Sequence, residues 1–143
     1  MDWKNEAIEK LCKLEAMEAA VENLQQETKR LELAFTGLQS ADPERVSRGG
    51  VTRGEDRLLS NIVQRKEVEN RLAQAKVWVE QVSRALAVLS HEERLILQRC
   101  FIKPEKCAVD NLCYDLQIEK SSVYRKRDKA LLTFTTALYG IAL

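Results

Sequence analysis

Residues that interrupt helices are scarce in this chain of 143 residues, which contains five glycines and two prolines. Aromatic residues make up only 6% of it, whereas charged residues make up 31%. Leu, Ala, Glu, Lys, Arg and Gln dominate the remainder, a balance that is typical of long helices exposed to solvent. The composition therefore argues against a protein rich in turns and predicts an all-α fold.

The chain also has little from which to build a metal centre or a catalytic site. His91 is its only histidine, and its four cysteines, Cys12, Cys100, Cys107 and Cys113, form no CxxC pair. No carboxylate pair, nucleophile with a base, or phosphate-binding loop is recognisable. We therefore expect no metal, no cofactor and no enzymatic activity, and we expect reduced thiols, as in a cytosolic protein.

Long apolar runs are missing as well. No stretch approaches the roughly 18 consecutive apolar residues of a membrane span. The first residues include Asp2, Lys4 and Glu6 and lead directly into a helical pattern, which excludes a signal peptide of the usual form. These absences predict a soluble, cytoplasmic protein without a membrane partner.

Heptad spacing is the main pattern of the first part of the chain. From Trp3 to Phe35 apolar residues recur at two core positions, which predicts one long helix. A second helix is predicted from Glu55 to Leu89 by alternating steps of four and three. The core positions of the first helix are Ala7, Leu14, Val21 and Phe35, and Trp3, Met17, Leu24, Leu31 and Leu38; those of the second are Val68, Leu72, Ala75, Val79, Val82, Leu86 and Leu89.

Between these helices, residues 37–54 contain a proline and four glycines, which predicts a flexible loop. Two helices of similar length joined by such a loop suggest an antiparallel, coiled-coil-like hairpin formed by residues 1–89. The same apolar stripes can instead pair between two chains. A homodimer through this helical arm therefore remains an alternative.

A different pattern begins at Ser90. Ser90 and Glu93 have the spacing of a capping box, which predicts the start of a new helix that ends at Lys103-Pro104. A short amphipathic helix follows from Val109 to Leu116, then a turn, and then a helix from Ser121 to Tyr139 with Gly140 as its stop signal. Residues 90–143 are thus predicted to form a three-helix domain with a helix-turn-helix motif, which can place its second helix in a DNA major groove.

Positive charge is concentrated in this last helix. Residues 119–143 carry five basic and two acidic side chains, as a DNA-binding surface requires. On a helical wheel Val123, Ala130, Leu131, Phe134 and Leu138 face inward. Polar residues at the beginning of the helix then become the candidates for DNA contact. We predict base contacts from Lys120, Ser121, Tyr124 and Arg125, and phosphate contacts from Ser122, Lys126 and Lys129.

Arg127 is the exception among the basic residues of this helix. On the wheel it points into the apolar sector, so we predict an internal ion pair with an acidic residue of the domain.

From Leu89 to Gly140 the chain resembles the fourth conserved region of bacterial sigma factors, and most closely the phage-encoded transcriptional regulators of the RinA and ArpU kind. The resemblance implies a promoter-binding regulator of phage or prophage type that contacts RNA polymerase and has no catalytic residues. At the turn position usually filled by Gly this chain has Gln117, which implies a positive φ at that residue. The matching segments are Leu89-Ser90-x-x-Glu93-Arg94-x-x-Leu97, Leu112-Cys113-x-x-Leu116-x-Ile118, Ser122-Val123-Tyr124-Arg125 and Ala130-Leu131.

The sequence thus favours a protein that binds double-stranded DNA and regulates transcription. One alternative is a DNA-packaging adaptor resembling small terminase subunits, which also join a helix-turn-helix to helical oligomerisation segments. Another is a coiled-coil adaptor that binds RNA polymerase or another protein and no longer binds DNA.

Overall fold

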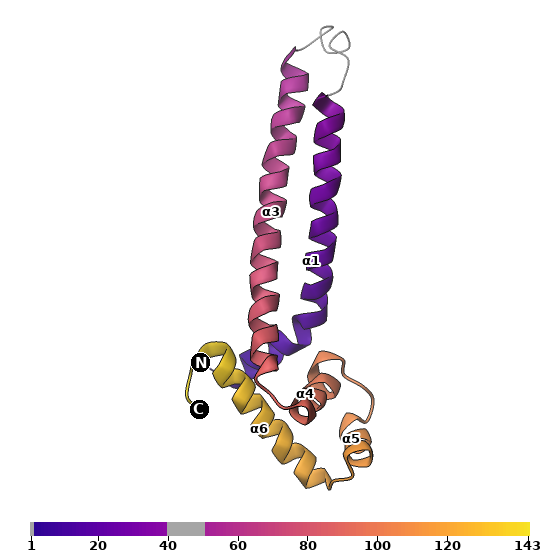
Figure 1. The fold of residues 1–143 in the computed structure, drawn as a ribbon, viewed down its shortest axis with the longest axis vertical. Coiled ribbons are helices and arrows are strands. Elements are labelled where there is room, and N and C mark those ends of the chain that lie inside the picture. Colours follow the sequence, from indigo (N-terminus) through magenta and orange to yellow (C-terminus); the bar gives the residue numbers. More distant parts are fainter. Residues whose placement is uncertain (1, 40–50) are drawn as a thin grey trace. The chain divides into compact units, whose positions relative to one another are not determined.

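The structure, a computed structural model, describes residues 2–39 and 51–143, with side chains from residue 54 onward in the second range. Its elements in these ranges are helical and no strand occurs there, so the predicted all-α fold is confirmed. Figure 1 shows their order: α1 (Trp3–Gln39), α3 (Val51–Ala87), α4 (His91–Leu97), the π-helical turn η1 (Gln98–Ile102), α5 (Ala108–Leu116) and α6 (Lys120–Tyr139). None of the described helices has both the length and the apolar character that a membrane span requires.

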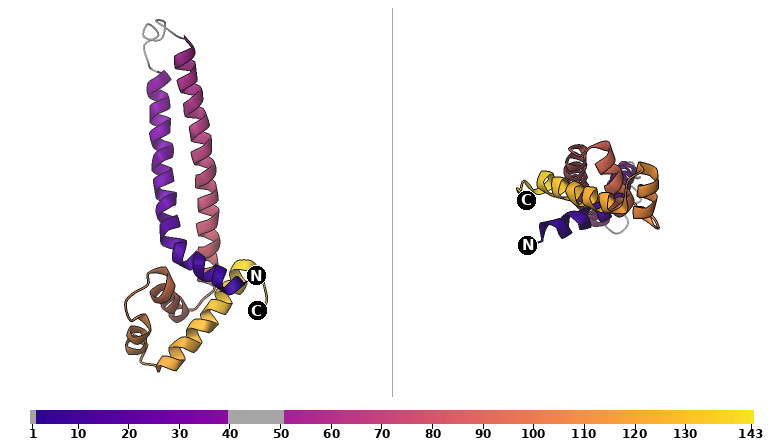
Figure 2. Two further views of the ribbon diagram at one scale, coloured as in Figure 1. Left: turned by 180° about the vertical axis from the view of Figure 1, so that it is seen from behind. Right: turned by 90° about the horizontal axis from the view of Figure 1, so that it is seen from below.

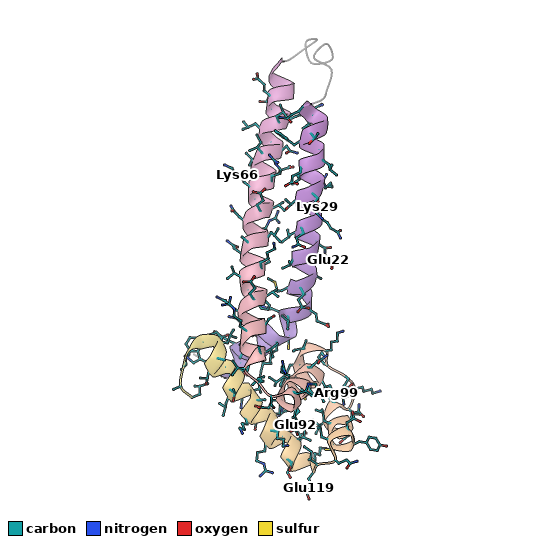
Figure 3. All side chains as sticks on the ribbon, viewed as in Figure 1. Glu22, Lys29, Lys66, Glu92, Arg99 and Glu119 are labelled. Carbon is teal, nitrogen blue, oxygen red and sulfur yellow. The ribbon has the colours of Figure 1, made fainter. Side chains whose placement is uncertain are left out.

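Helices α1 and α3 lie side by side and run in opposite directions (Figures 1 and 2). Their heptad residues face the seam between them, where the Asn61 side-chain amide donates a hydrogen bond of 3.0 Å to the Leu31 carbonyl oxygen. Charged side chains such as Glu22, Lys29 and Lys66 are exposed along the outside (Figure 3). The amphipathic pattern thus places one stripe of each helix against its neighbour.

The predicted loop over residues 37–54 is wrong at both ends. Helix α1 continues to Gln39 and α3 already begins at Val51. A single glycine costs a helix only about 1 kcal/mol, so Gly37 and Gly54 are tolerated as helical residues. The rest of the predicted loop, residues 40–50, lies outside the described residues.

The chain divides into two compact units. One, which we call the helix-turn-helix unit, comprises the residues up to Met17 together with Trp78–Leu143; the other, the arm unit, is Glu18–Val77. The sequence suggests a boundary after residue 89, but the structure groups both the first turns of α1 and the last turns of α3 with the three-helix domain. The physical reason is that these turns cover an apolar face of that domain.

This cover forms the larger of two cores in the helix-turn-helix unit. Residues from α1 and α3 enclose Phe134 of α6, which is completely buried. Leu97 of α4 is buried in the same core. The other buried members are Ala7, Leu11, Leu14, Val82, Ala85, Leu89, Ala130 and Leu131.

The smaller core holds the helix-turn-helix motif together. Ile96 of α4, Leu112 of α5 and Val123 of α6 are fully buried against one another. Cys113 and Ile118 are half-buried beside them. Because one buried residue comes from each helix, this core sets the mutual orientation of α4, α5 and α6.

The predicted capping box at the start of α4 is confirmed. The Glu93 amide donates to Ser90 Oγ over 3.2 Å, and the Ser90 amide donates to Glu93 Oε1 over 3.4 Å. The predicted helix from Ser90 to Pro104 is α-helical only as far as Leu97 and continues as the π-helical turn η1. At the other end of the unit, Gly140 ends α6 with φ of 69°, as its position after the last periodic residue predicts.

Candidate nucleic-acid interface

The turn between α5 and α6 depends on Gln117. Its φ of 54° and ψ of 46° lie in the left-handed region, which confirms the positive φ expected at this position. The Ile118 amide then donates to the Cys113 carbonyl over 3.3 Å, which closes the end of α5. Gln117 thus adopts the left-handed backbone conformation that glycine usually provides at such a turn.

The beginning of α6 presents a polar surface to solvent. Ser121, Arg125 and Lys129 are exposed, and Tyr124 keeps 39% of its surface accessible. Arg125 donates to Ser122 Oγ over 3.1 Å. Among the described residues, no carboxylate forms an ion pair with Arg125 or Lys129. Both of these predicted DNA contacts therefore keep their charge available to an outside ligand.

Two of the other predicted contacts are engaged within the protein. Lys126 Nζ lies 2.6 Å from Glu92 Oε1, a contact that joins α6 to the first turn of α4. Lys120 Nζ lies 3.7 Å from Asp110 Oδ1 in α5. A phosphate at Lys126 would have to compete with a short, half-buried pair, whereas the longer and more exposed pair of Lys120 is easier to open.

The surface also carries acidic groups. Glu119 is exposed immediately before α6 (Figure 3). Asp128 is exposed one turn beyond Arg125, and its carboxylate lies 3.9 Å from Lys4 Nζ. The positive charge of this face is therefore local to the side chains around Arg125, since carboxylates border it on both sides.

The predicted internal ion pair of Arg127 is wrong. Among the described residues no carboxylate lies within ion-pair distance of it. Its guanidinium carbon lies instead 4.9 Å from the ring centre of Tyr124 and 6.0 Å from that of Phe101. The aromatic rings that line this part of α6 and η1 provide a favourable surface for the cation, so burial does not require a carboxylate partner.

Arg127 also affects a neighbouring thiol. Burial raises the pKa of Cys100 above its ordinary value, and the nearby positive charge and hydrogen bond of Arg127 partly oppose that shift. All four cysteines are free. Cys100 thus behaves as a small, largely apolar side chain at the edge of the smaller core.

Arg99 stabilises the contact between η1 and α5, next to this surface. Arg99 of η1 donates a hydrogen bond to the Asp115 carboxylate of α5, which raises the pKa of Arg99, and its Nε lies 3.8 Å from Glu105 Oε1. Figure 3 shows Arg99 at the junction of these elements. The pair connects η1 to α5 and so helps to hold the first helix of the motif in place.

The sequence predicts DNA contacts from Lys120 and Tyr124, but it does not predict that Arg127 lies beside them. Lys120, Tyr124 and Arg127 are spaced by four and three residues, so they form a stripe next to the row that contains Ser121 and Arg125. Cys107, whose φ is 58°, lies near this stripe at the start of α5. The spacing of these three residues is visible in the sequence and indicates a shared helix face. The accessibility of Arg127, however, depends on the space that η1 and α5 leave beside it.

Comparisons with known proteins identify the family of the chain but no individual relative. Neither the curated proteins nor the solved structures include a match to it. The family model described as "Protein of unknown function (DUF1492)" matches residues 38–135, a range that includes α3 and continues through most of α6. Because the matched range covers more than half of the chain, the chain belongs to the DUF1492 family.

Proposed function

We propose that this protein is a cytoplasmic DNA-binding transcriptional regulator of phage or prophage type, related to the RinA and ArpU regulators and to region four of sigma factors. In this proposal α6 enters the major groove of double-stranded DNA, and the protein contacts RNA polymerase. The single observation that carries the proposal is the exposed beginning of α6, where Arg125 follows a left-handed turn and has no carboxylate partner among the described residues.

Each residue of this surface has a role that follows from its chemistry. Arg125 offers the planar pair of donors that matches two acceptors of guanine, and Ser121 and Tyr124 can bond base edges or phosphates. Lys129 is positioned one turn further along α6 and contacts a phosphate. Lys120 joins the base-reading set when its pair with Asp110 opens. Ser122 holds Arg125 through the hydrogen bond to its Oγ.

The experiment begins with DNA selection on the purified protein, followed by fluorescence anisotropy with the selected duplex. We expect Arg125→Ala to weaken binding by about 1–3 kcal/mol, the usual contribution of one bidentate base contact. Arg84→Ala is the matched control, because Arg84 is an exposed arginine on α3 that, among the described residues, forms an ion pair with Glu80 of the same helix alone. Its affinity for the duplex should stay unchanged.

Other outcomes would replace the proposal. If the purified protein binds no duplex at low salt, a DNA-binding function is wrong. Binding to RNA polymerase that survives charge reversal at both Arg125 and Lys129 would indicate a protein adaptor. A ring of many subunits in solution would indicate the DNA-packaging adaptor, whereas a monomer or dimer agrees with a transcriptional regulator.

A further inference from the structure

A cavity of about 290 Å³ opens beside the predicted base-reading end of α6. It lies between η1, the first turn of α5 and the side of α6 that carries Lys120, Tyr124 and Arg127. Its charged and aromatic lining residues, together with one exposed thiol, are Phe101, Cys107, Asp110, Lys120, Tyr124 and Arg127. The cavity is therefore built from the same motif as the proposed interface but faces a different side of α6.

The charges of this cavity favour an anion. Arg127 and Lys120 contribute two positive charges, and Asp110 contributes one negative charge. Arg127 has no carboxylate partner among the described residues, and its Nε is buried without a hydrogen-bond acceptor. Lys120 lies 3.7 Å from the Asp110 carboxylate, in an exposed ion pair. An incoming oxyanion would thus meet a guanidinium whose charge no carboxylate of the described residues neutralises.

The walls of the cavity fit the same kind of ligand. Tyr124 and Phe101 flank the guanidinium and limit its orientations, which reduces the entropy lost when it binds a planar or tetrahedral oxyanion. The first turn of α5 forms another wall. Its N-cap residue, Cys107, makes no side-chain capping bond, so the free amide groups of that turn add partial positive charge.

We infer that this cavity binds a backbone phosphate of the DNA duplex, with Arg127 as its charged ligand. The inference rests on the proposed function. The cavity shares Lys120 and Tyr124 with the base-reading surface, so a duplex whose bases are read by Ser121 and Arg125 brings its backbone to the cavity mouth. Arg127 is then a DNA ligand, whereas its sequence position suggested a purely internal role.

The salt dependence of binding tests this assignment. Each phosphate neutralised by a cation contributes about 0.9 to the slope of log K against log salt concentration on duplex DNA. Arg127→Gln should therefore lower the slope by about 0.9, and Arg84→Gln, which removes the same charge from α3, should leave it unchanged. Equal slopes for wild type and Arg127→Gln would overturn the inference, because a structural role lowers affinity without changing the number of counterions released.

Two further variants sharpen this result. Arg127→Lys keeps the positive charge but loses the planar guanidinium. This variant should retain the salt dependence of wild-type binding but bind the duplex more weakly. Asp110→Asn removes the one negative charge of the cavity, so it should bind the duplex more tightly. Weaker binding by Asp110→Asn would contradict an anion site at this position.

Alkylation of the wild-type protein gives a test that needs no variant to fold. Cys107 is exposed and lines the cavity, whereas Cys12 is exposed on α1 and lies outside it. Bound duplex should slow the alkylation of Cys107 severalfold, as measured by peptide mass spectrometry, and leave Cys12 unchanged. Unprotected Cys107 in a sample that binds DNA would overturn the inference while leaving the proposed function standing.

The source of the phosphate is tested in the same experiment. Inorganic phosphate alone, at the concentration of nucleotide phosphate used with the duplex, should protect Cys107 much less than the duplex does. Equal protection, together with an unchanged slope for Arg127→Gln, would mean that the cavity binds a free oxyanion, and the inference of a DNA phosphate would be wrong. Absence of any salt-dependent duplex binding would instead remove the proposed function itself.

Discussion

The helix-turn-helix unit and the arm unit bury their apolar residues to different degrees. The largest fully buried side chains, which include Phe134, Ile96, Leu112 and Val123, lie in the helix-turn-helix unit. In the described part of the arm unit, the most buried side chain is Leu31, which keeps 3% of its surface exposed. The first unit packs several elements around two cores, whereas the second has one seam between two helices.

This difference follows from geometry. A helix in a two-membered hairpin can bury only one stripe, so its other faces stay in water however apolar they are. In the arm unit Leu33 and Leu59 are accordingly 74% and 60% exposed. Regions with little buried apolar surface open locally at lower free energy. We therefore expect amide hydrogens of the arm unit to exchange faster than those of α4 and α6.

The largest effect is expected from breaking the core of the helix-turn-helix unit. Phe134→Ala removes a fully buried aromatic side chain and should lower the free energy of unfolding by about 3–5 kcal/mol, measured by urea denaturation. Leu33→Ala, at an exposed position of the arm unit, is the control and should change it by less than about 0.5 kcal/mol. Similar losses for the two variants would mean that the two units do not differ in packing as described.

A smaller effect of opposite sign is expected in the seam of the arm unit. Asn61 is 6% exposed and donates to the Leu31 carbonyl, but its Oδ1 is buried without a hydrogen-bond partner. Asn61→Leu removes that unsatisfied group and adds apolar contact, so we expect the free energy of unfolding to rise by about 1 kcal/mol.

Thermal denaturation followed by circular dichroism measures this change. Asn61→Ala serves as the matched variant, because it removes the same amide without adding apolar surface and should not stabilise the protein. A lower melting temperature for Asn61→Leu would indicate that the amide stabilises the seam more than an apolar residue does, as buried polar residues that define helix register can do.

The smallest effect concerns the turn before α6. Gln117→Gly relieves the cost of a left-handed backbone and should stabilise the helix-turn-helix unit by about 0.5–1 kcal/mol in urea denaturation. The same change at Gln74, an exposed helical residue of the arm unit, should destabilise by about 0.8–1 kcal/mol. If both changes had the same sign, the φ of Gln117 would not be the source of strain.

Much of the helical structure follows from local sequence. The start of α4 and the end of α6 were predictable because a capping box and a glycine act on neighbouring backbone groups. The loop predicted over residues 37–54 extended too far at both ends. Gly37 and Gly54 lie within α1 and α3, because extending a long helix by one residue outweighs the small cost of a glycine. The exposure of Ser121 and Arg125 also follows from the helical wheel, which uses only local periodicity.

The sequence by itself determined the helices, the capping box, the left-handed turn at Gln117 and the inward face of α6, because each depends on residues a few positions apart. Only the tertiary structure decided that the ends of α1 and α3 share a core with Phe134, that Lys126 pairs with Glu92, and that Arg127 lines an open cavity. These contacts join distant segments, and no local periodicity specifies which surfaces meet. Packing and charge between elements therefore determine which basic side chains of α6 are available to bind a ligand.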